Sequence, residues 1–310
     1  MSKTIREAYG ESLLKYGKDD PRVVVLDADV STSTRSLVFA KGCPERFFNM
    51  GIAEANMVGA AGGMAACGKI VFVNSFAVFL STLGLLSARA FGSYSGLNLK
   101  FMGAYGGLSD AYDGPSHHSV EDLAIMRALP HFKVFVATDE HQVDWLVKTA
   151  IDTDGPVYIR LSRDSLPEVY SKDTKFEIGK GQILREGKDL TILACGVMVG
   201  QALKAGEMLA AQGISARVVD LFTIKPIDRP LILESAEKTG LMVSAEEHSV
   251  IGGLGGAVAE VLAKAGSPAK LACVGLEDTH AETGAYPQLL KKYKLDADAI
   301  VAQALGGLQK

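Results

Sequence analysis

The feature of this chain that most restricts its fold is an alternation of short β-branched runs with longer helical patterns. Such alternation is typical of a parallel sheet covered by helices. In the first half of the chain, strands are expected at residues 22–30, 70–76, 99–104, 133–138 and 157–161. After residue 187, strands are expected at residues 190–195, 216–221, 241–245 and 270–275, with a helix near residues 201–212.

The two series are separated by a polar connection. The alternation weakens across residues 165–187, which contain Pro167 and a polar run at 171–175. A chain of 310 residues, of which 48% are hydrophobic, is long for a single core. We therefore predict an α/β protein of two domains, each a mainly parallel sheet flanked by helices, with the boundaries 1–170, linker 171–187 and 188–310.

The composition disfavours several kinds of partner. The net charge is −4 and the Lys and Arg residues are scattered, so nucleic acid is not an expected partner. The chain begins without an apolar signal core and holds no convincing membrane span, which predicts a cytoplasmic protein. The four cysteines have no metal-ligand spacing, and we expect no metal site and small core roles for Cys43, Cys67, Cys195 and Cys273.

Glu54 is the first candidate for a functional residue. It is the only formal charge between Phe47 and Gly68, in a stretch of small and apolar residues. Burying a carboxylate without a partner costs several kcal/mol, so the chain or a ligand has to supply a hydrogen bond to it.

Two glycine-rich stretches resemble nucleotide-binding loops only superficially. Residues 63–69 nearly match a phosphate-binding loop, but Ile70 stands where Ser or Thr would hold magnesium, and the order is helix then strand. The run Gly252–Gly256 has Val258 at the last glycine position of the dinucleotide fingerprint. We interpret the first as a helix-to-strand turn and the second as a close-packed helix start.

Residues 106–121 form a polar loop after the third expected strand. The loop contains two adjacent histidines, two aspartates and a proline, and Asp113 and His117 flank its Gly-Pro pair. A rigid turn that holds a carboxylate and an imidazole suits the binding and deprotonation of hydroxyl groups. Ser119 is expected to cap the helix that follows.

Three further residues follow expected strands, and the sequence allows either a functional or a structural role for each. Arg163, after the strand at 157–161, could hold a phosphate or carboxylate, or could pair with Asp164 on the surface. Phe76 and Phe79 could offer a ring face to a heterocycle or could fill the core.

Four motifs occur in the order seen in transketolases, and the chain resembles that family over essentially its whole length. They are Gly-Ile-Ala-Glu-Ala-Asn at 51–56, Asn-Ser-Phe-Ala-Val-Phe at 74–79, Asp-Gly-Pro-Ser-His at 113–117 and Leu-Ser-Arg at 161–163. The resemblance implies a pyrimidine-binding domain followed by a transketolase C-terminal domain. The chain is most similar to the C-terminal subunit of split transketolases.

The resemblance also implies a role for each candidate residue. Glu54 would bond to N1′ of the aminopyrimidine of thiamine diphosphate, in a pocket that Phe76 and Phe79 line. Glu54 and His117 would be the catalytic residues. Substrate contacts would come from Asp113 and His117 to hydroxyl groups, from Arg163 to the sugar phosphate, and from Arg6 and Ser33 at further phosphate-contacting positions.

The chain departs from complete transketolases in ways that imply a partner. It contains no Gly-Asp-Gly, the segment with which those enzymes bind magnesium and the diphosphate. We therefore expect an N-terminal partner subunit that carries the Mg²⁺ and the diphosphate site, in an α2β2 assembly. Residues 103–105 lack a histidine that is typical of the family, and Thr82 replaces its third aromatic residue.

Three alternatives remain open at this stage. The first two are a β subunit of a 2-oxo acid dehydrogenase and a 1-deoxyxylulose-5-phosphate synthase, either of which an assay with pyruvate would detect. The third is a non-catalytic scaffold subunit that kept the fold. A scaffold has no need for Glu54, Asp113, His117 and Arg163 together.

Overall fold

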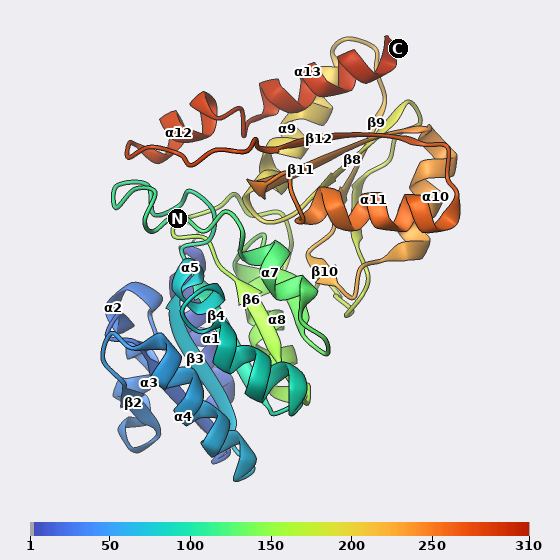
Figure 1. Cartoon of the computed structure of the whole chain (residues 1–310). Coiled ribbons are helices and arrows are strands. Elements are labelled where there is room, and N and C mark those ends of the chain that lie inside the picture. Colours follow the sequence, from blue (N-terminus) through green and yellow to red (C-terminus); the bar gives the residue numbers. More distant parts are fainter. Residues whose placement is uncertain (1–2, 310) are drawn as a thin grey trace.

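The computed structural model describes residues 3–309, which form two α/β units (Figure 1). The first comprises α1 (Ile5–Gly17), β1 (Val23–Asp27), α2 (Ser31–Thr34), α3 (Leu37–Gly42), the 3₁₀ turn η1 (Pro44–Arg46), β2 (Phe47–Asn49), α4 (Glu54–Ala66), β3 (Ile70–Phe76), α5 (Ala77–Ser81), α6 (Leu85–Ser87), the π-helical turn η2 (Ala88–Tyr94), β4 (Leu99–Ala104), α7 (Asp122–Ala128), β5 (Lys133–Val136), α8 (Glu140–Asp152) and β6 (Val157–Arg160). The elements that follow are β7 (Gln182–Arg185), β8 (Leu190–Ala194), α9 (Val197–Ala210), β9 (Ala216–Asp220), β10 (Thr223–Lys225), α10 (Arg229–Thr239), β11 (Leu241–Ser249), α11 (Leu254–Ala265), β12 (Lys270–Leu276), α12 (Tyr286–Lys292) and α13 (Ala297–Leu308).

The first sheet has seven strands in the order β10-β5-β6-β4-β3-β1-β2. Its pairs are parallel except for β10, which runs antiparallel to β5. Successive side chains of a strand face opposite sides, so Val23 and Val25 pack in the cluster that contains α1, α3 and α8, while Val24 and Leu26 pack in the cluster that contains α4 and α7. Because β3, β4 and β6 are parallel, the residues that follow them meet at one edge of the sheet.

The second sheet has five strands in the order β12-β11-β8-β9-β7, and only β7 is antiparallel to its neighbour. Helices α9 and α13 contribute to the cluster on one face, and α10 and α11 to the cluster on the other. The predicted fold class, two mainly parallel sheets flanked by helices, is confirmed.

The connection between the units differs from the expected simple linker. Strand β7 lies inside the stretch 171–187, and β10, which follows β9 in sequence, joins the first sheet. Both strands are short, antiparallel and at a sheet edge, so neither carries the long buried apolar run that marks the central strands. One apolar cluster includes residues of both units, such as Val136 and Leu193.

The cysteines only partly follow expectation. Cys43 and Cys195 are buried, but Cys67 is exposed and Cys273 is partly exposed. The prediction of a core role for Cys67 is wrong because this residue forms the C-terminal cap of α4 and is exposed there. Within residues 3–309, no helix has the length and apolar character needed to cross a membrane.

Candidate functional site

Glu54 is the first residue of α4 and is buried, with 4% of its surface exposed. An acid in the first turn of a helix is favoured by the partial positive charge of the free backbone amides there. Among residues 3–309, its carboxylate has one hydrogen bond, which Ser75 Oγ donates to Oε1 at 2.8 Å. A second carboxylate oxygen thus remains for a ligand, next to the end of β3.

An aromatic cluster follows directly after Ser75. The ring of Phe76 lies 6.0 Å from that of Phe79, 4.6 Å from that of Tyr105 and 5.8 Å from that of His117, between ring centroids. Phe79 and His117 meet edge to face at 5.2 Å. Phe76 and Phe79 belong to a small apolar cluster separate from the main cores.

The loop that carries Asp113 and His117 folds over this cluster. His117 Nδ1 is 3.0 Å from Ser116 Oγ, and side-chain ligand atoms of Asp110, Asp113 and His117 all lie within 4.8 Å of one another. The expected helix cap by Ser119 is wrong. Ser119 is buried and pairs through its backbone with Gly107, and α7 begins only at Asp122, without a side-chain cap.

Two arginines converge on Tyr105. The guanidinium carbons of Arg6 and Arg163 lie 5.1 and 5.2 Å from the centre of its ring, within cation–π distance. Arg6 also donates to the Tyr105 hydroxyl at 2.6 Å, to the backbone oxygen of Ser33 at 2.9 Å and to that of Arg163 at 3.0 Å. Burial lowers the pKa of Arg6 from its ordinary value. The structure therefore brings Arg6, Ser33 and Arg163 into one positively charged group.

Asp110 supplies the negative charge in this group. Arg163 pairs with Asp110 at 3.2 Å, and not with Asp164 as one reading of the sequence expected. Asp110 is fully buried and its Oδ2 atom has no hydrogen-bond partner among the described residues. Burial, followed by the charge of Asp113, raises the pKa of Asp110 to about 6.

Asp110, Asp113 and His117 are close enough together to hold a metal ion. The guanidinium of Arg163 beside Asp110 opposes a second positive charge there. The three side chains are therefore better suited to hydrogen bonds with polar atoms of a ligand than to holding a cation.

The glycine-rich stretches take the roles that the sequence predicts. Residues 63–69 connect the end of α4 to β3. At the second stretch, Glu246 caps α11, because its carboxylate accepts from the backbone of Leu254 at 2.6 Å and of Gly255 at 2.8 Å.

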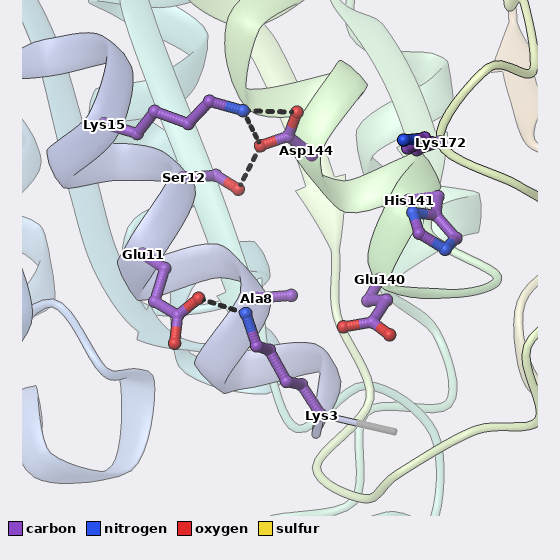
Figure 2. A pocket seen from close by; sticks show the side chains of 9 residues that line it. All are labelled: Lys3, Ala8, Glu11, Ser12, Lys15, Glu140, His141, Asp144 and Lys172. Carbon is purple, nitrogen blue, oxygen red and sulfur yellow. Dashed lines mark hydrogen bonds and ion pairs between the residues drawn. The ribbon is translucent and has the colours of Figure 1, made fainter. Parts of the chain in front are cut away.

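A surface hollow of about 670 Å³ lies elsewhere, between α1 and α8. Figure 2 shows two ion pairs among its lining residues, Lys15 with Asp144 and Lys3 with Glu11. None of the predicted site residues lines it. We therefore place the functional site at the carboxyl edge of the first sheet instead.

All eight predicted site residues lie in this one region. Seven are connected by the ring, guanidinium and carboxylate contacts described above, and Glu54 is joined through Ser75, the neighbour of Phe76. The sequence reading missed Ser75 and Asp110. Both lie within motifs that were singled out, Ser75 between Asn74 and Phe76 and Asp110 three residues before Asp113.

Comparison with known proteins agrees with this geometry. Residues 1–169 match the family model of the transketolase pyrimidine binding domain, and residues 179–300 match that of the transketolase C-terminal domain. A putative transketolase C-terminal section from Methanocaldococcus jannaschii is 44% identical, over 99% of this chain and 97% of that protein. The 6-deoxy-6-sulfo-D-fructose transketolase subunit SqwH from Clostridium sp. (strain MSTE9) is 42% identical, over 97% of this chain and 93% of that protein.

Among solved structures, one described as a split gene transketolase, an inactive β4 tetramer, superposes with a TM-score of 0.90. It is 48% identical to this chain and covers 100% of it, and the match extends over 99% of that structure's chain. Together with the two domain matches, these relatives confirm the resemblance found in the motifs: the chain belongs to the transketolase family.

Proposed function

We propose that this chain is the C-terminal subunit of a two-chain transketolase, which transfers a two-carbon ketol unit from a ketose phosphate to an aldose. The observation that carries the proposal is the single cluster at the carboxyl edge of the first sheet. It combines a buried acid, aromatic faces, a hydroxyl-binding loop and a pair of arginines. Each of these parts has a separate use in ketol transfer.

The residues of the cluster fit thiamine diphosphate, the cofactor that the transketolase family generally uses together with a divalent metal. Glu54 has one carboxylate oxygen without a donor among the described residues, and it is bonded to Ser75, which directly precedes Phe76 in β3. When bound, the cofactor supplies the electron sink for ketol transfer. Glu54 would hold a proton at N1′ of the pyrimidine, and Phe76 and Phe79 would pack against that ring.

The remaining cluster residues suit a sugar phosphate. Asp113 and His117 would bind hydroxyl groups of the donor, with His117 near the reacting carbons. Arg163 and Arg6 would hold the distal phosphate, at the mouth of the site where Ser33 also lies. The hydrogen bond between Ser116 Oγ and His117 Nδ1 would fix the imidazole ring.

The names of the relatives support a partner chain. One is described as a C-terminal section, another as a subunit, and the solved β4 tetramer as inactive. We propose that an N-terminal subunit carries the diphosphate and Mg²⁺ site and that the active assembly is α2β2. The alternatives that act on pyruvate are disfavoured because Asp113, His117 and Arg163 suit hydroxylated, phosphorylated donors.

The proposal is tested by co-expressing the chain with a candidate partner that contains Gly-Asp-Gly. The purified complex should bind thiamine diphosphate in a calorimeter and should transfer a ketol unit from a ketose phosphate to an aldose. Either chain alone should be inactive. Turnover by the isolated chain, a complex that turns over equally well without the cofactor, or activity with pyruvate as donor would each contradict the proposal.

Replacing Arg163 by Gln should reduce kcat/KM for fructose 6-phosphate by about 10–100-fold, mainly through KM, because a charge-assisted hydrogen bond contributes roughly 1.5–3 kcal/mol. The donor 3-hydroxypyruvate, which has no distal phosphate, should be used as well as before. Steady-state kinetics with both donors measure the difference. As a control, Arg229→Gln removes an exposed arginine of α10 and should affect neither donor.

Asp110 should make the binding of an anionic donor depend on pH. With a pKa of about 6, its carboxyl is ionised at pH 7.5 and competes for Arg163, whereas at pH 5.5 it is mostly neutral. A sulfonated ketose such as 6-deoxy-6-sulfofructose stays singly charged over this range, so its KM should fall several-fold between pH 7.5 and 5.5. Asp110→Asn should remove this pH dependence and keep the low KM. Identical profiles for the two proteins would refute the role.

A further inference from the structure

The loop at residues 106–121 is closed at its base by backbone pairing. Gly107 and Ser119 each donate an amide hydrogen to the other's carbonyl at 2.9 Å. The amide of the next residue, Leu108, donates at 2.8 Å to Oε1 of Glu247, which belongs to β11 of the second unit. The base of the loop is thus attached to the other domain.

The tip of the loop also lies against the second unit, beside the segment that leads into α12 (Figure 1). The amide of Gly284 donates to the carbonyl of Ala111 at 3.1 Å. At Gly114 a Cβ atom would lie 2.2 Å from Thr283 Oγ1, and φ there is +81°, so only glycine fits this close approach. Asp113 is therefore flanked on both sides by residues that contact the second unit.

Glu247 is the point at which three segments join. Its Oε1 atom accepts from Leu108 in the loop and, at 2.9 Å, from the hydroxyl of Tyr286 at the start of α12. It is buried, with 3% of its surface exposed, and a Cβ atom at Gly107 would lie 2.3 Å from its carboxyl carbon. The side chain consequently has little room to move away from the loop.

The other end of the loop is held by a neighbouring group. Arg160 donates to the carbonyl of Ser119 at 2.6 Å and to the backbone carbonyl of Glu247 at 3.0 Å. Arg160 is the last residue of β6, so it joins the first sheet, the end of the loop and β11. Both ends of the loop are therefore set by contacts to one strand of the second unit.

We propose that the second unit serves the reaction by positioning the substrate loop, with Glu247 as the positioning residue. Glu247 acts through the amide of Leu108 and the hydroxyl of Tyr286, and it fixes the loop so that Asp113 and His117 face the aromatic cluster. This inference rests on the proposed function, because the loop has to bind the donor. It gives the second unit a part in donor binding although that unit supplies no residue to the reacting centre.

The test compares Glu247→Ala with Glu247→Gln in the complete two-chain enzyme. Alanine removes the acceptor for both hydrogen bonds, whereas glutamine keeps a carbonyl oxygen of the same reach. Alanine should lower kcat/KM for fructose 6-phosphate by about 10–100-fold, with a rise in KM, and glutamine should restore it to within about threefold of the wild type. The affinity for thiamine diphosphate should be unchanged in both, because Glu54, Phe76 and Phe79 lie outside the loop.

A second variant keeps the test informative if Glu247→Ala does not fold. Tyr286→Phe removes one of the two donors and leaves the Leu108 contact, so it should lower kcat/KM about two- to fivefold and speed hydrogen exchange in residues 106–121. The control Glu237→Ala removes an exposed acid on α10 and should change neither quantity.

The outcomes separate the two proposals. A wild-type complex that transfers no ketol unit would overturn the proposed function itself. An active wild type combined with unchanged kcat/KM in Glu247→Ala and Tyr286→Phe would overturn the positioning role alone. The positioning role would also be overturned if, in Glu247→Ala, the affinity for thiamine diphosphate fell as much as kcat/KM, since that would indicate a general loss of structure.

Discussion

Replacing Glu54 by Gln should lower the kcat of the assembled two-chain enzyme by about 10²–10⁴-fold, the usual contribution of a positioned acid or base. The amide has almost the same shape as the carboxylate and can still accept from Ser75 Oγ, but it cannot hold a proton at the pyrimidine nitrogen. The chain should therefore fold and assemble normally. Steady-state turnover, thermal unfolding and calorimetric titration with thiamine diphosphate measure the three quantities separately.

The interpretation of this result depends on its controls. Glu207→Gln replaces an exposed acid of α9 whose side chain has no hydrogen bond or ion pair within the described part of the chain, and it should leave kcat unchanged. Glu54→Ala, which also removes the acceptor for Ser75, should be at least as inactive as Glu54→Gln. Normal turnover in a correctly assembled Glu54→Gln complex would contradict both the assignment of Glu54 and the proposed chemistry.

Much of the site could be predicted from the sequence because of the way parallel sheets are built. The β-branched runs locate the central strands, and the ends of parallel strands lie at one edge, so residues just after β3, β4 and β6 had to be neighbours. That argument places Phe76, His117 and Arg163 at one edge of the sheet, and the observed strand order β6-β4-β3 makes them neighbours there. Glu54 could be identified as a further site residue because it is a lone charge in an apolar stretch, and a buried acid needs a hydrogen-bond partner.

The remaining contacts carry no periodic signal and could not be predicted in this way. Asp110 pairs with Arg163 across 53 positions of sequence, and Glu247 reaches Leu108 across 139. The first contact depends on how the loop after β4 folds back over the end of β6, and the second on how the two units pack. Both satisfy polar groups that folding buries. Ser119 was misread for the same reason, since a serine before a helix usually caps it, but the loop closure with Gly107 places it inside.

The second large effect is expected at Arg160, where replacement by Met should destabilise the full chain by about 3–5 kcal/mol. Arg160 is buried and its Nε atom lies 3.1 Å from Oδ2 of the fully buried Asp122. Met has a similar size but no charge, so it leaves Asp122 without its ion-pair partner and removes one of the two donors to the Ser119 carbonyl. Urea unfolding, followed by circular dichroism at pH 7, measures the loss of unfolding free energy.

The same variant should respond to pH in a way that identifies the buried charges as the cause. In the wild-type chain, burial raises the pKa of Glu247 to about 7 from an ordinary value of 4.5, and the charge of Arg160 lowers it in part. Between those values the folded chain binds more protons than the unfolded chain, so stability falls as pH rises. Without Arg160 the pKa of Glu247 should rise further, so the loss of stability in Arg160→Met should be larger at pH 8 than at pH 5. Adding Asp122→Asn to this variant should recover part of the lost unfolding free energy, because it removes the unpaired charge. If the losses of unfolding free energy caused by the two replacements were strictly additive at every pH, the ion pair would not be responsible.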